Sequence, residues 1–552
     1  MTVGLWTSRD LQPHDFKNTL SALKPLIPTM RPPKKVLALL SIAAIVQLYG
    51  ASAVAAEKLS NRTGKQWAPF LEWNLKNPSC DGNPFDLVAA ATFVHAKSSA
   101  RCATEMFFAG DDTWRFRFTG TRPGLWTFTT ASSDADLDDR HGSVTIEAND
   151  DSYGMVTGAG SKWARQRGRN GDLTAFVPQF VMYGHPGTFH EQPNKIDTDI
   201  GTFISEHGFT GFHVPVQCRW FQIEHDRSSS IKSGDPDPDR RTFAALELVI
   251  TRVHAAGGVV HLWAWGDESR RQTPVKWGIN GKADKRLQRY IAARLGPLPG
   301  WTMGYGFDLD EWVSERQLGQ WRDYLHQHLG WPHLLGGRHA DPNHGLDHST
   351  AISWNRRMDY ASYEHHRPTH EVYVAAVRAV PNKPVFSEDR FRIRQSERYR
   401  GKDYTEATTR RGLWHSTMAG GVANIWGKLD GDLGINKGLG MSKRYDNPHW
   451  IKTWSVFFRG RFQLDSEPAR GLSNGLSLRS RGSGHWVFYR EDTDSIEMDL
   501  SAATGEQPAI AVDTKKPYKE INLGRLTPPK ASWRAPYDSD WAIAVGEPVD
   551  PN

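Results

Sequence analysis

The 552-residue chain is too long for one ordinary domain, and its composition of 38% hydrophobic and 24% charged residues is that of a folded globular protein. Of the formal net charge of +6, residues 1–56 carry +4, so the remainder is close to neutral. Because no long basic block stands out, the sequence argues against a nucleic-acid-binding protein.

The N-terminal segment has the order of a secretory signal. Met30 is followed by Arg31, Lys34 and Lys35, then by an apolar run over 36–48 and by small residues over 51–55. This order of basic region, apolar region and A-x-A site predicts cleavage and export. We interpret 1–56 as a leader with the true start at Met30, and expect a secreted or periplasmic protein without a stable membrane span. The alternative is an uncleaved anchor over 36–56, which Gln47, Tyr49 and Gly50 would interrupt.

Three cysteines bear on the redox state. An exported protein can form disulfides, and Cys80 and Cys102 lie in the same predicted domain and could pair. Cys218 would then be free and buried. None of the three has the spacing of a metal site.

Residues 57–155 predict an N-terminal β-sandwich. Strand-like runs cover 86–94, 114–119 and 125–130, and Arg115-Phe116-Arg117-Phe118 alternates as a half-buried strand does. Pro123-Gly124 predicts a turn between two of these strands. The polar stretch over 149–160 predicts a linker.

Residues 160–455 change rhythm and predict a catalytic (β/α)8 TIM barrel, an α/β fold, because eight apolar strand candidates alternate mostly with helical patterns. Helical apolar spacing is clear over 241–256 and 312–329, and a further helix is expected over 370–380. The strand candidates are 176–183, 211–216, 259–265, 302–307, 333–337, 358–363, 384–387 and 422–426.

Residues 456–552 return to short strands and predict a C-terminal β-sandwich-like domain. The strand candidates are 476–479, 486–489, 496–500 and 509–512, separated by Pro and Gly.

Acidic residues follow two of the predicted barrel strands. Glu388 ends the seventh strand before an arginine-rich loop, and Asp308 and Glu311 follow the fourth. Active sites of barrels lie at the carboxyl ends of the strands, and glycoside cleavage needs two carboxyl groups there, one ionised and one protonated. We expect Glu388 as the nucleophile and Glu311 or Asp308 as the acid/base. Other polar and aromatic residues at these strand ends are expected to bind a sugar: Trp426, His213, Trp263, Trp265, Tyr363, Glu364, Arg390 and Arg338.

Each of these acids also has a purely structural interpretation. Asp308 and Glu311 could be a capping pair at the start of a helix. Glu388 could form an ion pair with Arg390 or Arg392.

Two other functions stay open. His339, Asp341, His344 and His348 offer metal-binding side chains, so a metal-dependent hydrolase is one alternative. A non-catalytic cell-surface carbohydrate-binding protein with a degenerate barrel is the other. Irregular spacing with Pro342 and Gly345 favours a loop over a metal site, and we expect no metal or other cofactor.

Four segments carry a resemblance to a known group. Lys383-Pro384-Val385-Phe386-Ser387-Glu388 resembles the seventh-strand run of clan A glycoside hydrolases, and Gly420–Gly427 is similar to their eighth-strand segment, whose Trp lines the sugar subsite. Asn83-Pro84-Phe85 and Arg122–Trp126 resemble a sandwich domain found ahead of such bacterial barrels.

The resemblance implies a retaining, cofactor-free hydrolase of polysaccharides or oligosaccharides, with Glu388 at the nucleophile position. The clan's Asn-Glu pair after the fourth strand is absent, since Asp310 precedes Glu311 here. Either Asp308 or Glu311 therefore takes the acid/base position, and Glu311 is narrowly favoured. The arginines at 338 and 390–394 hint at a sulfated or uronic acid sugar.

Overall fold

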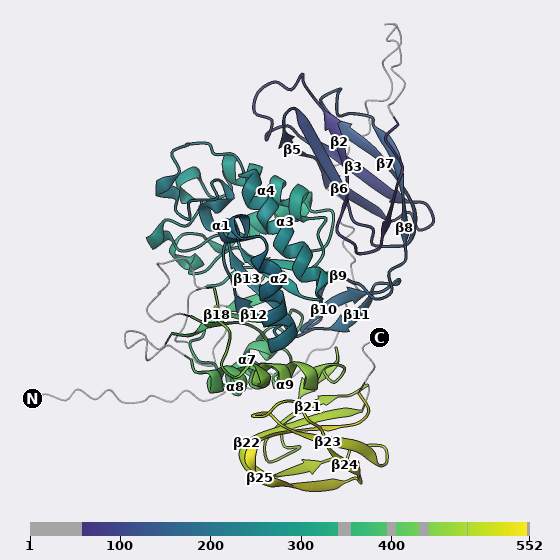
Figure 1. Ribbon diagram of the computed structural model, residues 1–552, viewed down its shortest axis with the longest axis vertical. Helices are drawn as coiled ribbons and strands as arrows, with labels where there is room; N and C mark the ends of the chain where they lie inside the picture. The colour runs from purple at the N-terminus through teal and green to yellow at the C-terminus, as the bar shows by residue number, and fades with distance from the viewer. Residues whose placement is uncertain (1–57, 340–354, 395–403, 430–440, 483, 549–552) are drawn as a thin grey trace, which may run out of the picture. The chain divides into compact units, whose positions relative to one another are not determined.

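The computed structural model describes residues 58–339, 355–394, 404–429, 441–482 and 484–548 (Figure 1). The predicted leader and all of the His339–His348 segment except His339 lie outside these ranges. Among the helices within them, none is both long and apolar enough to cross a bilayer.

The N-terminal region is a pair of facing sheets, as the alternating pattern predicted. Its strands are β1 Arg62–Lys65, β2 Leu71–Lys76, β3 Ala89–His95, β4 Arg101–Glu105, β5 Phe107–Gly110, β6 Thr113–Phe118, β7 Gly124–Ser132 and β8 His141–Glu147. They form sheets of order β1-β8-β7-β3-β4 and β2-β6-β5. Trp73 of one sheet contacts Phe128 of the other, with ring centroids 5.0 Å apart. Aromatic side chains from both sheets thus share one core.

The cysteines in this region are not bridged. Cys80, Cys102 and Cys218 are all free, so the pairing considered for Cys80 and Cys102 does not form. The Cys102 thiol instead donates to the carbonyl of Gly330 at 3.2 Å. Cys218 is buried, as expected.

The predicted linker over 149–160 is wrong, because this segment enters a third small sheet. Strands β9 Tyr153–Ala159, β10 Lys162–Arg167 and β11 Asp172–Ala175 pair antiparallel. Buried Trp163 donates its indole N–H to the carbonyl of Val385 at 3.0 Å, and Lys162 donates to Gly420 at 3.0 Å. The sequence of this segment looks like a polar linker because it has few apolar side chains. Those that are buried pack on the barrel rather than on each other.

Eight parallel strands form the central barrel. They are β12 Gln179–Met182, β13 Gly211–Pro215, β14 Val259–Trp263, β15 Trp301–Gly304, β16 Leu335–Gly336, β17 Ala361–Tyr363, β18 Val385–Ile393 and β19 Ala423–Lys428. Their order is β16-β15-β14-β13-β12-β19-β18-β17, so all eight predicted strands are confirmed. The ring closes between β16 and β17 through one isolated bridge, His339 to Tyr363.

Amphipathic helices cover the outside of these strands (Figure 1). The helices are α1 Pro186–Glu191, α2 Lys195–Asp199, α3 Arg240–Ala255, α4 Lys282–Leu295, α5 Glu315–His328, α7 His370–Ala379, α8 Glu406–Met418 and α9 Pro448–Phe458, with a π-helix, η1, over Ile200–His207. The apolar stripe of α3, including Phe243, Leu246 and Val249, is buried against the barrel wall. The predicted helices over 241–256 and 370–380 are confirmed, and the one over 312–329 starts three residues later than predicted.

The C-terminal region is a six-stranded sheet of order β20-β21-β22-β25-β23-β24. Its strands are β20 Ser466–Pro468, β21 Leu476–Ser480, β22 His485–Asp499, β23 Gln507–Asp513, β24 Ile521–Leu526 and β25 Lys530–Val545. The separate strands predicted over 486–489 and 496–500 are wrong, because they are two halves of β22. The charged residues between them, which look like a loop, form register shifts against β25.

Candidate active site

A bulge in β18 builds the centre of the candidate site. Ser387 pairs with Asn424 and Arg390 pairs with Ile425, so β18 fits two additional residues, Glu388 and Asp389, into this step. Bulges of this kind re-aim side chains next to active sites. The strand continues to Ile393, so the prediction that it ends at Ser387 before an arginine-rich loop is wrong.

Glu388 lies at the carboxyl end of the barrel, fully buried among hydrogen-bond donors. The indole N–H of Trp263 and the hydroxyl of Ser362 donate to its two carboxylate oxygens. Nε2 of His261 lies 3.2 Å from Oε1. Within the described ranges Arg390 forms no ion pair with Glu388, so the structural alternative that pairs these two residues is wrong. Donors on two other strands, β14 and β17, hold the carboxylate in one orientation.

Gly304 leaves the room that this carboxylate occupies. A Cβ atom at position 304 would lie 2.3 Å from Oε1 of Glu388, closer than any unstrained contact. The glycine at the end of β15 is therefore part of the site.

The acidic turn after β15 differs from a helix cap. Asp308 has a left-handed backbone, with φ of 52°, and its side chain makes no cap hydrogen bond to the 3₁₀ turn Leu309–Glu311 that follows. The next helix, α5, begins later and is capped by Ser314. The capping alternative is therefore wrong, and Asp308 forms an ion pair with Arg338.

Glu311 is exposed on this turn, beside other carboxylates. Partial desolvation, the charges of Asp267 and Asp308, and a hydrogen bond with Asp267 raise the pKa of Glu311 to about 7. A carboxyl group with this pKa can hold a proton at neutral pH.

Arg338 is a buried cation that several carboxylates surround. Besides Asp308 it contacts Glu364, with Nη1 3.1 Å from Oε2, and lies 3.9 Å from Asp389. Burial alone would lower the pKa of Arg338, but these carboxylates raise it above its usual range. Burial would likewise raise the pKa of Asp389, but a hydrogen bond with His366 and the charge of Arg338 lower it strongly.

One group of side chains in the described ranges has the chemistry of a metal site. Ligand atoms of Glu364, His366 and Asp389 lie within 4.8 Å of one another. Because Arg338 already neutralises two of these three groups, a divalent cation would have to compete with a buried guanidinium. The arrangement thus favours an ion-pair network over a metal centre.

Three predicted sugar-binding residues do not line the barrel mouth. Trp426 points outward from β19, where its ring packs on Gly412 of α8 and its indole N–H donates to Gln179 at 2.7 Å. Tyr363 packs in a buried cluster with residues of α7. Trp265 is buried with its ring 6.0 Å from that of Phe221. The roles of Trp426 and Tyr363 were wrong because successive strand residues face opposite sides of the sheet. Trp265 lies beyond the end of β14, where the strand alternation no longer sets its direction.

The other predicted residues gather around Glu388. Trp263 contacts it directly, Arg338 and Glu364 form an ion pair at the mouth, and Arg390 lies over the ring of Trp263. His213 is buried one layer deeper, with Nδ1 2.9 Å from Nδ1 of His261. Burial and the neighbouring His261 lower the pKa of His213 well below its usual value, which favours the neutral imidazole.

Sequence reasoning missed His261, Ser362 and Phe307. A signal existed for the first two, because His261 lies two residues before Trp263 and Ser362 lies two residues before Glu364, on the same strand faces. Phe307, whose ring centroid is 4.6 Å from that of Trp263, was expected only as the end of a strand.

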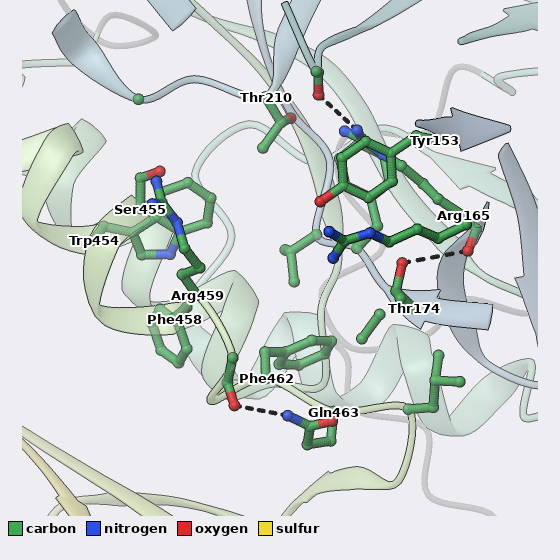
Figure 2. Close-up of a pocket in the computed structure, with 18 of the residues that line it drawn as sticks. Tyr153, Arg165, Thr174, Thr210, Trp454, Ser455, Phe458, Arg459, Phe462 and Gln463 are labelled. Carbon is green, nitrogen blue, oxygen red and sulfur yellow. Dashed lines mark hydrogen bonds between the residues drawn. The ribbon is translucent and has the colours of Figure 1, made fainter. Parts of the chain in front are cut away.

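A cavity of about 740 Å³ lies at the opposite end of the barrel (Figure 2). Its lining includes Val177, Thr210 and Gly257, which directly precede or approach the starts of β12, β13 and β14. In Figure 2, Tyr153 and Arg165 face Trp454 and Phe458 of α9 across it. Because barrel active sites lie at the carboxyl ends of the strands, this cavity is not the catalytic one.

Comparison with known proteins gives the fold. Residues 63–133 match the family model "Domain of unknown function (DUF5060)". No curated protein matches. A Bacteroides vulgatus structure assigned to the glycoside hydrolases is similar at 16% identity and a TM-score of 0.65, covering 88% of this chain and all of that one. A family 5 glycoside hydrolase from the same organism matches at 14% identity and a TM-score of 0.51, covering 71% of this chain and 93% of that one. The chain thus has the barrel fold seen in these glycoside hydrolases, with flanking β-domains.

Proposed function

We propose that the chain is an exported, retaining glycoside hydrolase that cleaves glycosidic bonds in a polysaccharide or oligosaccharide. The observation that carries this proposal is the carboxylate of Glu388, held by Trp263, Ser362 and His261 at the carboxyl end of the barrel. These donors hold the carboxylate in one orientation, as attack on an anomeric carbon requires. Export rests on the signal-like order of residues 30–56.

In this mechanism Glu388 attacks the anomeric carbon and forms a glycosyl ester as the bond to the leaving oxygen breaks. Glu311 gives its proton to that oxygen, and then takes a proton from the water that hydrolyses the ester. Its raised pKa supports Glu311 for this role, whereas Asp308 is engaged with Arg338. Asp308 remains the alternative acid/base.

The test is the configuration of the first product. Purified protein is incubated with a panel of neutral, sulfated and uronate-rich polysaccharides, and the anomer released is followed by NMR before mutarotation. We expect the product to keep the configuration of the substrate. An inverted product would contradict the covalent role of Glu388. Saturable sugar binding with no turnover of any substrate would instead favour the non-catalytic binding protein.

The pH profile should identify the acid/base. If Glu311 donates the proton, kcat/KM should fall above pH of about 7, because the carboxyl loses its proton as the pH rises through its raised pKa. In Glu311→Gln this alkaline limb should disappear and the rate should drop by roughly 10²-fold or more. The matched variant Asp308→Asn should keep the limb. The reverse pattern would assign the role to Asp308.

A further inference from the structure

Arg390 is a buried cation beside the proposed nucleophile. It follows Glu388 by two residues on β18, and only 7% of it is exposed. Its guanidinium carbon lies 4.9 Å from the ring centroid of Trp263 and 5.4 Å from that of Phe307. Because the indole N–H of Trp263 donates to Glu388, Arg390 covers a ring that is itself part of the carboxylate's binding site.

The guanidinium of Arg390 has no anionic partner in the part of the chain that the structure describes. The adjacent acid, Asp389, accepts a hydrogen bond from the backbone N–H of Arg390 at 2.7 Å and holds His366 with its other oxygen at 2.8 Å. Arg338 shows the contrast. Its guanidinium carbon lies 5.8 Å from the ring centroid of Trp263, but it also binds both Asp308 and Glu364. Arg390 is left with aromatic faces alone.

The charges around Arg390 add to the excess of positive charge at this position. Burial, followed by the positive charges of Arg392, Arg270 and Arg338, lowers the pKa of Arg390 well below its usual value, and the charge of Asp389 offsets only part of this. Arg270 forms an ion pair with Asp267 at 3.2 Å, and Arg338 forms one with Glu364. These acids therefore already have cationic partners. A buried charge without a counterion is costly, so an anion that entered here would be strongly favoured.

We propose that Arg390 binds an anionic oxygen group, the carboxylate of a uronic acid or a sulfate ester, on the sugar next to Glu388. This inference rests on the proposed function, which places a sugar there, and it makes the substrate an anionic saccharide. The planar fork of a guanidinium donates two parallel hydrogen bonds to such a group, and the rings of Trp263 and Phe307 hold the fork in place.

The experiment measures binding of matched oligosaccharide pairs by calorimetry at constant ionic strength. One pair is a uronate oligosaccharide and its methyl ester, and the other is a sulfated oligosaccharide and its desulfated form. Wild type, Arg390→Gln and Arg390→Lys are compared, with Arg534→Gln as the control, because the Arg534 side chain is 84% exposed on the C-terminal sheet. Circular dichroism shows whether each variant is folded.

In wild type, the charged member of one pair should bind roughly 10-fold or more tightly than its neutral counterpart, and that pair identifies the anion. Arg390→Gln should lose this preference, Arg390→Lys should keep part of it, and Arg534→Gln should keep all of it. The proposal is overturned if neither charged member is preferred, or if the preference survives in folded Arg390→Gln. Turnover is assayed separately. An anion preference without turnover would contradict the proposed hydrolase activity but not the anion-binding role of Arg390. Turnover without any preference for the charged member of either pair would do the reverse.

Discussion

Replacing Glu388 with glutamine should lower kcat by about 10³-fold or more on any substrate that the wild type cleaves. The amide cannot attack the anomeric carbon, so the covalent step is lost. The fold should survive, because the amide oxygen can accept from Trp263 and His261 while its NH₂ group donates to the hydroxyl of Ser362. Steady-state kinetics and thermal unfolding of the two proteins give the measurement.

Two additions separate a nucleophile from a residue that only shapes the site. In Glu388→Ala, added azide or formate should enter the vacated space and restore part of the rate, with azide yielding an inverted glycosyl azide. Glu497→Gln, an exposed carboxylate on β22, is the matched control and should retain wild-type kcat. Activity that survives in Glu388→Gln would remove this residue from the mechanism and direct attention to the Asp308–Glu311 turn and the His339–His348 segment.

Arg338→Gln should have the largest effect on stability. It leaves the carboxylates of Asp308, Glu364 and Asp389 without their shared counterion, and breaking a buried ion pair costs about 3–5 kcal/mol. We expect the barrel to unfold at a clearly lower temperature in calorimetry at pH 8.

The pH dependence of this loss has a definite sign. In wild type the pKa of Asp389 is depressed, so its stabilising contribution is present above the unfolded value of about 3.9 and is lost as the pH falls further. In Arg338→Gln the stranded carboxylates can be relieved by protonation. The difference between the two proteins should therefore shrink from pH 8 to pH 4. Arg534→Gln should show little loss at either pH. An equal deficit at both pH values would mean that Arg338 acts through packing rather than charge.

The barrel was predictable because each of its strands is a short apolar run followed by a turn and usually a helical stripe. The sequence also allowed a prediction of which side chains on each strand face the barrel interior and which face outward. Ala423 and Ile425 face the interior core with Phe386, so Trp426 had to face outward. Applying the same alternation to 360–364 would have separated inward Ser362 from outward Tyr363.

The bulge in β18 could not be predicted. Its two additional residues change which side chains face inward, and nothing in Ser387-Glu388-Asp389-Arg390 marks where the ladder shifts. The donors around Glu388 come from residues 26 to 127 positions away, so only the closed barrel brings them together. The small sheet over 153–175 was missed because its buried residues pack on the barrel, and a single segment shows no sign of its partner.

The join between β16 and β17 links the barrel's integrity to its chemistry. Backbone pairing there is one isolated bridge and one hydrogen bond, which the N–H of Asp359 donates to the carbonyl of Leu335 at 2.9 Å. The side chain of Asp359 reinforces this lower end by accepting from the backbone N–H of Leu335 at 2.9 Å. At the upper end the two edges are held together by Arg338, which follows β16, and Glu364, which follows β17. An ion pair between side chains therefore helps to close the barrel at the carboxyl ends of these two strands. Because the charge of Arg338 also acts on Glu388, a change at this ion pair would affect the closure of the barrel and the proposed active site together.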